Sequence, residues 1–276
     1  MPHERYTANR DMKLGLCVWP VMVRELWQAR ELIARLFLRS LSARYKQAFL
    51  GIAWAVIVPG VAIGTFVFLK RTGIVSIGAT DVPYPLFALL GVSLYQLLAT
   101  GISSSCGALV EAGDMIAKVS FPREVLVIAA IAQAVFEFMV KIVLIALVCV
   151  YYQVVPPVGA LWSTVAVVPL LCMALGLGLF FSLLNAVFRD TAQALSMILM
   201  FAMFLMPILY PVDGAHELFF RMNPLVALIE GPRDLFIYGA LRHPTDFFVA
   251  GVLSVLVCLI AWRIFHLVET KIPERL

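Results

Sequence analysis

Polar and apolar residues alternate at a helical period between residues 24 and 46, just before a long uncharged stretch. The polar side chains follow one another at steps of three or four and share one helix face: Arg24, Gln28, Glu31, Arg35, Arg39, Ser42 and Lys46. The opposite face is apolar, with Leu26, Ile33, Leu36, Phe37 and Leu41. The pattern predicts a helix lying in a membrane interface with its apolar face among the acyl chains. The alternative is a helix packed on a soluble core.

Several uncharged stretches are long enough to cross a bilayer, which requires roughly 20 mostly apolar residues. Counting from the proline and glycine breaks gives six spans, with the segment 156–159 separating two that otherwise run together. The spans cover residues 51–69, 84–110, 125–152, 161–187, 192–210 and 247–268. The sequence therefore predicts an all-α membrane protein with six transmembrane helices.

Two parts of the chain are expected to differ in their environment. Residues 1–50 form a cytoplasmic N-terminal segment with the amphipathic helix, and residues 51–276 form the transmembrane domain. Nothing at the N-terminus resembles a cleaved signal peptide, because the first apolar stretch leads into further spans.

The connection between the fifth and sixth spans is too long and too apolar for a plain surface loop. Asn223 and Pro224 form a helix start, and the helix should run to Gly239. With the apolar piece around Phe219, we expect two short helices that enter the outer leaflet and return without crossing it. The alternative is an ordinary amphipathic hairpin at the membrane surface.

The loop between the second and third spans contains a short amphipathic pattern. Met115, Ile116 and Val119 share one face of a helix flanked by charged residues. This ridge predicts a helix that docks on a partner, although simple packing at the interface gives the same periodicity.

Composition excludes a water-soluble globule, since 62% of residues are hydrophobic, 14% are charged and the mean hydropathy is +0.96. Most Lys and Arg residues fall on the side of the membrane that holds both chain ends, which places both termini in the cytoplasm. The formal net charge of +4 is then explained by the basic residues on the cytoplasmic side, and we expect no nucleic-acid partner.

The inventory of reactive groups is small. Glu137 and Lys141 are four residues apart within the third span, where they can neutralise one another in the bundle interior. A proton relay is the alternative role for this pair. The histidines and cysteines have no metal-ligand spacing, and the sequence contains no phosphate-binding GxxxxGK[ST] loop. We therefore expect no metal site, and any energy from ATP has to arrive through a partner.

Five short stretches, at residues 42–59, 118–124, 185–190, 207–211 and 223–225, resemble in order the membrane subunits of polysaccharide-exporting ABC transporters of the ABC-2 type. The resemblance is closest to the O-antigen and teichoic-acid permeases, with capsule permeases more distant. It implies a homodimer in the bacterial inner membrane that exports a lipid-linked polysaccharide. Two copies of an ATPase subunit would bind the ATP and Mg, so this chain would need no cofactor.

The resemblance also implies roles for particular residues. The amphipathic helix becomes a gate at the cytoplasmic interface. Residues 111–122 contain a coupling helix that contacts the ATPase through Met115, Ile116, Lys118 and Phe121. The outer hairpin would gate the far end of a channel formed by spans 1 and 5 of both copies.

Two further groups of residues fit the chemistry of such a substrate. The anionic diphosphate head of a polyprenyl carrier would be attracted by Arg35, Arg39, Arg44 and Lys46. Aromatic faces suit a moving sugar chain, and the two candidate channel spans carry Trp54, Phe66, Phe68, Phe201, Phe204 and Tyr210. Packing or contact with lipid is the alternative role for each of these aromatics.

Two other classes of protein stay open at this point. A proton-driven secondary transporter would show internal repeats and broken helices at mid-membrane, and Pro59 and Pro207 do interrupt two spans. A membrane enzyme acting on lipid-linked sugars would need a deep polar constellation, for which the sequence offers only Glu137 and Lys141. We therefore expect a permease subunit without an ATPase site of its own.

Overall fold

The computed structural model describes residues 18–45, 80–119, 121–211 and 220–268, together with scattered positions between 53 and 72. Across these residues the secondary structure is helical, and no strand occurs among them. The helices are α1 (Val18–Gln28), α2 (Arg30–Tyr45), α4 (Tyr84–Glu111), α5 (Gly113–Lys118), α6 (Glu124–Tyr152), α7 (Ala160–Val187), α8 (Thr191–Leu205), α10 (Pro224–Tyr238) and α11 (Pro244–Val268).

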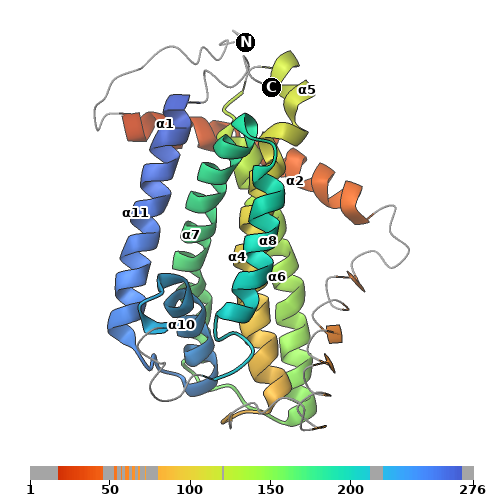
Figure 1. Ribbon diagram of the computed structural model, residues 1–276, viewed down its shortest axis with the longest axis vertical. Helices are drawn as coiled ribbons and strands as arrows, with labels where there is room; N and C mark the ends of the chain where they lie inside the picture. Colours follow the sequence, from red (N-terminus) through yellow and green to blue (C-terminus); the bar gives the residue numbers. More distant parts are fainter. Residues whose placement is uncertain are drawn as a thin grey trace.

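Four of these helices are long and apolar enough to cross a membrane: α4, α6, α7 and α11. They run along the long axis of the molecule and form a bundle (Figure 1). The positions of all four confirm the spans expected from the sequence. α4 is the central helix, packed against both α6 and α7, and 78% of its most apolar window is buried.

Small residues allow the helices to approach closely, as is common in membrane bundles. A methyl group added at Gly178 of α7 would lie 2.7 Å from Cβ of Ser105 in α4. A methyl group at Gly176 would lie 2.8 Å from backbone atoms of Cys258, where α7 meets α11. These contacts hold α7 between the central helix and the last helix.

α8 is a shorter apolar helix, and it ends earlier than expected. The sequence predicted a span over residues 192–210, whereas α8 runs from Thr191 to Leu205. Pro207 explains the difference, because the residue before a proline is disfavoured in the helical conformation. The segment after α8 then packs on α4, where Gly91 lies against the backbone of Ile208.

The first predicted span, 51–69, lies largely outside the described residues. Its isolated described positions include Trp54 and Phe68, both exposed. The count of six spans therefore stays a prediction.

Two ends of the bundle carry different helices (Figure 1). The α5 end is where α5 lies and where α1 and α2 cross the bundle. The α10 end is the opposite end, where α10 lies. α4, α7 and α11 run toward the α5 end, whereas α6 and α8 run away from it.

The amphipathic segment forms two helices where one was predicted. It begins at Val18 and is interrupted at Ala29, although Ala29 N still donates to Glu25 O and Ile33 N donates to Ala29 O, each at 3.0 Å. The predicted polar face is exposed wherever it is described. Leu26, Ile33 and Leu36 pack on the core at the α5 end, so much of the apolar face is covered by protein where acyl chains were expected.

α10 confirms the helix predicted between the last two spans. The Asn223 side chain accepts a hydrogen bond of 3.0 Å from Leu225 N, Pro224 occupies the first turn, and Gly239 ends the helix with φ 76°. The second helix of the predicted hairpin, around Phe219, lies outside the described residues. The re-entrant path therefore stays a prediction.

Candidate functional site at the α5 end

A groove of about 800 Å³ opens between four helices at the α5 end. We call it the α5 groove. Its walls come from α2, the last turns of α4, α5 and the first turns of α6. It therefore joins the predicted gate helix to the predicted coupling helix.

Four charged side chains line the α5 groove, and we call the part of the groove that they line its mouth: Arg39, Glu111, Asp114 and Lys118. All four are exposed. Among the residues that the structure describes, none of them forms an ion pair or a side-chain hydrogen bond. Two bases and two acids are thus presented outward around one opening.

The interior of the groove is hollow because its walls carry small side chains. Ala108 of α4 and Ala129 and Ala130 of α6 line it, at positions where larger apolar residues would fill the space. Further from the mouth lie Ser104 and Gln133. Gln133 is 8% exposed and has no hydrogen-bond partner within the described part of the chain.

The predicted coupling residues divide between the groove and the core. Ile116 and Phe121 are buried in the core at the α5 end and attach α5 to the bundle. Met115, Lys118 and Val119 line the α5 groove, and Val119 is 56% exposed. A partner at this end would meet the exposed side chains of this segment, since Ile116 and Phe121 face inward.

The predicted head-group residues are only partly described. Arg35 and Arg39 are exposed on α2, and Arg39 lines the α5 groove. The Arg44 side chain and the whole of Lys46 lie outside the described residues.

The other predicted residues lie elsewhere in the molecule. Glu137 and Lys141 are 7% and 3% exposed on one face of α6, as a neutralising pair requires. Phe201 and Phe204 are exposed on α8. Tyr210 contacts the Phe220 ring at 6.5 Å, and its hydroxyl donates to the Phe204 carbonyl at 3.4 Å.

The remaining channel candidates are on the first predicted span. Trp54 and Phe68 are exposed, and Phe66 lies outside the described residues.

Sequence reasoning missed a buried carboxylate beside the coupling segment. Glu124 at the start of α6 is 1% exposed. Its Oε1 accepts a hydrogen bond of 3.1 Å from Trp262 Nε1, and His266 Nδ1 lies 3.1 Å from the same atom. Trp262 in turn makes an edge contact with Trp19 at 5.7 Å, so Glu124 ties α6 to α11 and α1.

A second missed network lies at the α10 end and is centred on Arg233, which is 4% exposed. Arg233 donates to the Pro207 carbonyl at 3.1 Å and to Glu230 at 3.0 Å, and its guanidinium lies 4.3 Å from the centre of the Phe87 ring. The charges were visible in the sequence, but their burial was not. Arg233 thereby holds the end of α8 against α10 and α4.

The same network continues through shared partners. Asp81 accepts hydrogen bonds from Tyr238 at 2.7 Å and from Arg242 at 3.0 Å. Burial raises the pKa of Glu230 and of Asp234, although nearby Arg233 acts in the opposite direction. Burial and the bond to Asp81 raise the pKa of Tyr238 to about 12.

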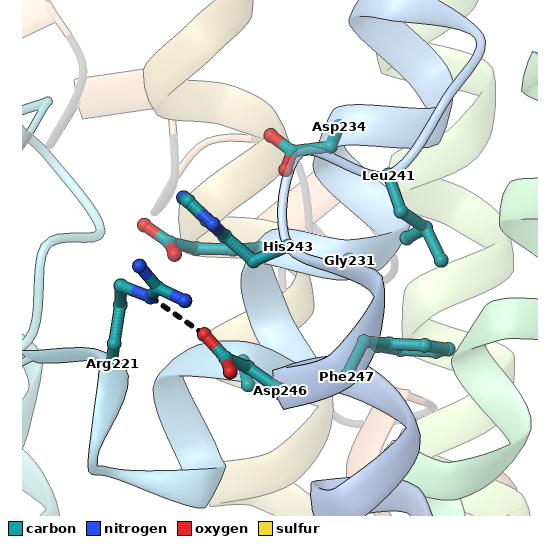
Figure 2. Close-up of a pocket in the computed structure, with 9 residues that line it drawn as sticks. Arg221, Gly231, Asp234, Leu241, His243, Asp246 and Phe247 are labelled. Carbon is teal, nitrogen blue, oxygen red and sulfur yellow. Dashed lines mark hydrogen bonds and ion pairs between the residues drawn. The ribbon is translucent and has the colours of Figure 1, made fainter.

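A small hollow lies between α10 and α11 (Figure 2). Its volume is about 10 Å³, and Arg221 Nε donates to Asp246 Oδ2 at 2.6 Å beside it. The polar groups at this end are therefore used largely within the chain.

Long apolar helices packed around a central helix define a multi-pass membrane protein. Residues 31–237 match the family described as ABC-2 type transporter, and the match covers most of the 276 residues. The chain belongs to this family and is a permease of an ABC-2 exporter. The matched region is the membrane domain, which has no ATPase site, and members of the family typically bind no cofactor themselves.

Curated relatives agree with this assignment. An O-antigen export system permease protein RfbA from Myxococcus xanthus is 26% identical over 251 residues, covering 89% of this chain and 95% of the relative. A protein of the same description from Klebsiella pneumoniae is 26% identical over 247 residues, covering 86% and 91%. The resemblance inferred from the short motifs is thus confirmed.

Proposed function

We propose that this chain forms the membrane half of an ATP-driven exporter that moves a lipid-linked polysaccharide of the O-antigen, capsule or teichoic-acid kind across the bacterial inner membrane. The observation that carries the proposal is the similarity to O-antigen export permeases over nearly the whole length of both proteins. Two ATPase subunits and a second copy of the chain complete the exporter.

The proposed topology has six spans and both termini in the cytoplasm. α2 lies at the α5 end, whereas Asp81 is bonded to Tyr238 and Arg242 at the α10 end. The end of α2 and Asp81 therefore lie at opposite ends of the bundle, which supports a crossing over residues 51–69. Residues 1–50 then form the cytoplasmic segment and residues 51–276 the transmembrane domain, with α10 in the outer leaflet.

Coupling to the ATPase is assigned to α5. The helix is short, contacts the end of α4, and is anchored by Ile116 in a core cluster that also contains residues of α6, so force applied to it would reach both helices. Met115, Lys118 and the exposed Val119 form the contact surface, while Phe121 and Ile116 transmit the movement into the core.

The substrate path is assigned to three groups. The basic residues of α2, with Arg44 and Lys46 after it, attract the diphosphate of the lipid carrier. The exposed aromatics of α8 and of the first span line the channel once the second copy is in place. Glu137 and Lys141 neutralise one another inside the bundle and take no part in proton transfer.

The proposal is tested by reconstitution in proteoliposomes with the ATPase subunit. We expect transport of the lipid-linked polysaccharide that requires both ATP and the ATPase. The variant Val119→Asp should lose this transport, whereas the variant Arg242→Ala at the α10 end should keep it. Transport by the chain alone, driven by a proton gradient, would overturn the proposal in favour of a secondary transporter.

A further inference from the structure

We propose that the α5 groove binds the first sugar of the lipid-linked glycan, and that Gln133 and Ser104 recognise its hydroxyl groups. This inference rests on the proposed function, since it specifies which part of the substrate the groove binds. It assigns the groove a role in substrate selection that is separate from the attraction of the diphosphate by α2.

The polar floor of the groove lies well inside the bundle. At 1.5 Å per residue, Gln133 is roughly 13 Å along α6 from its start at Glu124, and Ser104 is roughly 10 Å along α4 from its end at Glu111. Gln133 is 8% exposed and lines the hollow, yet it has no hydrogen-bond partner within the described ranges. Its amide faces the hollow, and a ligand there would supply the hydrogen bonds that the described part of the chain does not.

The polar groups of the groove match an uncharged sugar next to a phosphate. A carboxamide and a hydroxyl each donate and accept, as sugar hydroxyl groups do. The carboxylates of Glu111 and Asp114 at the mouth are further acceptors for hydroxyl groups. Arg39 of α2 provides the positive charge for the adjoining phosphate.

The mixture of charges argues against two simpler occupants. A bare diphosphate would favour bases alone, and two carboxylates at the same mouth oppose it. An acyl chain would favour an apolar floor, whereas here the floor carries Gln133 and Ser104. The groove volume of about 800 Å³ falls in the usual range for small-molecule sites, roughly 300–1,000 Å³.

The alanine walls supply the space that the sugar ring needs. Ala108, Ala129 and Ala130 leave the hollow between α4 and α6 open. A leucine at position 129 would occupy it, while a leucine at Ala146, which is exposed on the same helix, would not.

The test measures binding to the purified permease–ATPase complex in detergent. One probe is a short-chain polyprenyl diphosphate carrying a single hexose or N-acetylhexosamine, taken from a small panel, and the other is the same diphosphate without a sugar. We expect at least one sugar to tighten binding by about tenfold, as two neutral hydrogen bonds would allow. The preference should fall to about onefold in Gln133→Leu and in Ala129→Leu.

Matched variants separate this effect from misfolding. Ala146→Leu on α6 and Gln193→Leu on the exposed side of α8 should keep the full preference. Ser104→Ala, a small change, should reduce it by about threefold to fivefold. ATP hydrolysis by each complex reports whether assembly is intact.

Equal binding of all probes to the unchanged complex, or a preference that survives in Gln133→Leu and Ala129→Leu, would overturn the inference. In that case ATP-dependent export by the unchanged complex would still support the proposed function. Loss of export together with failure to assemble with the ATPase would contradict the proposed function itself.

Discussion

The two ends of the bundle use their charged residues in opposite ways. At the α5 end, Arg39, Glu111, Asp114 and Lys118 surround a groove of about 800 Å³, and none is ion-paired within the described part of the chain. At the α10 end, buried Arg233 is paired with the partly exposed Glu230, and the polar hollow between α10 and α11 measures only about 10 Å³. Charges that a protein does not pair internally remain available to other molecules, so we expect partners to bind at the α5 end.

The contrast has an energetic basis. Removing one partner of a buried pair leaves an uncompensated charge and is strongly destabilising, whereas an exposed charge in water contributes little to stability. Substitutions at the α10 end should therefore change stability, and substitutions at the α5 end should change association and transport.

Arg233→Ala should have the largest effect on stability. It leaves Glu230 and the Pro207 carbonyl without their buried donor, which is expected to cost about 3–5 kcal/mol. Thermal unfolding of the detergent-solubilised protein measures the loss. Arg39→Ala is the control, and it should stay within about 0.5 kcal/mol of the unchanged protein. Equal losses in the two variants would contradict the contrast between the ends.

Glu124→Ala tests the exception at the α5 end, where one carboxylate is buried. Trp262 Nε1 loses its acceptor, and we expect a loss of about 1–3 kcal/mol in the free energy of unfolding. Glu124→Gln keeps an acceptor oxygen and should lose less. Identical unfolding midpoints for the two variants would show that the hydrogen bond does not stabilise the junction of α6 and α11.

Val119→Asp should weaken binding of the ATPase subunit by about tenfold or more. Val119 is exposed beside α5, and an aspartate there would place a charge in an apolar part of the contact surface. Co-purification and titration of the ATPase subunit measure the change. Val249→Asp on the exposed face of α11 has similar exposure in the bundle and should leave this affinity unchanged once the protein is folded. Equal binding of Val119→Asp and the unchanged protein would remove α5 from the contact.

The free energy of unfolding should depend on pH through two carboxyl groups at the α10 end, those of Glu230 and Asp234. Burial raises the pKa of Glu230 and Asp234 above the ordinary values of 4.5 and 3.8, so the folded protein holds these protons more tightly than the unfolded chain. Their contribution to the free energy of unfolding is therefore full below these ordinary values and is lost as the pH rises through the raised ones.

Unfolding midpoints of the unchanged protein and of Glu230→Gln, measured from pH 4 to pH 8, report this dependence. The unchanged protein should gain stability relative to Glu230→Gln as the pH falls. A relative loss on acidification would mean that the ionised form of Glu230 is the one stabilised by folding.

Arg242→Ala should have the smallest effect. Its ion pair with Asp81 is well exposed, so we expect a loss of less than about 1 kcal/mol, and less still at high salt. The same unfolding measurement, repeated at low and high ionic strength, checks both expectations. A loss as large as that of Arg233→Ala would contradict the distinction between buried and exposed pairs within the α10 end.

Much of the fold could be predicted because membrane helices depend on local properties. The long apolar stretches predicted α4, α6, α7 and α11, and the Asn223–Pro224 pair predicted the start of α10. The polar face of α2 could be read from its period. The end of α8 was predicted too late, since apolar residues continue beyond Pro207 while the helix does not.

The candidate site depended on contacts that the sequence does not encode locally. His266 lies 142 positions from Glu124 along the chain, and nothing near either residue indicates that they meet. Gln133 is a polar residue within an apolar span, and only the structure shows that it is buried and lines the groove. Ile116 was predicted on a docking ridge, and the structure instead places its side chain in the core.

The central claim is that the α5 end receives the ATPase while the α10 end serves the chain itself. Single cysteines at position 119 and at position 242 can be labelled with a membrane-impermeant thiol reagent, before and after the ATPase subunit is added to the open, detergent-solubilised protein. We expect the ATPase to slow labelling strongly at position 119 and to leave labelling at position 242 unchanged. Protection at position 242, with none at position 119, would contradict it.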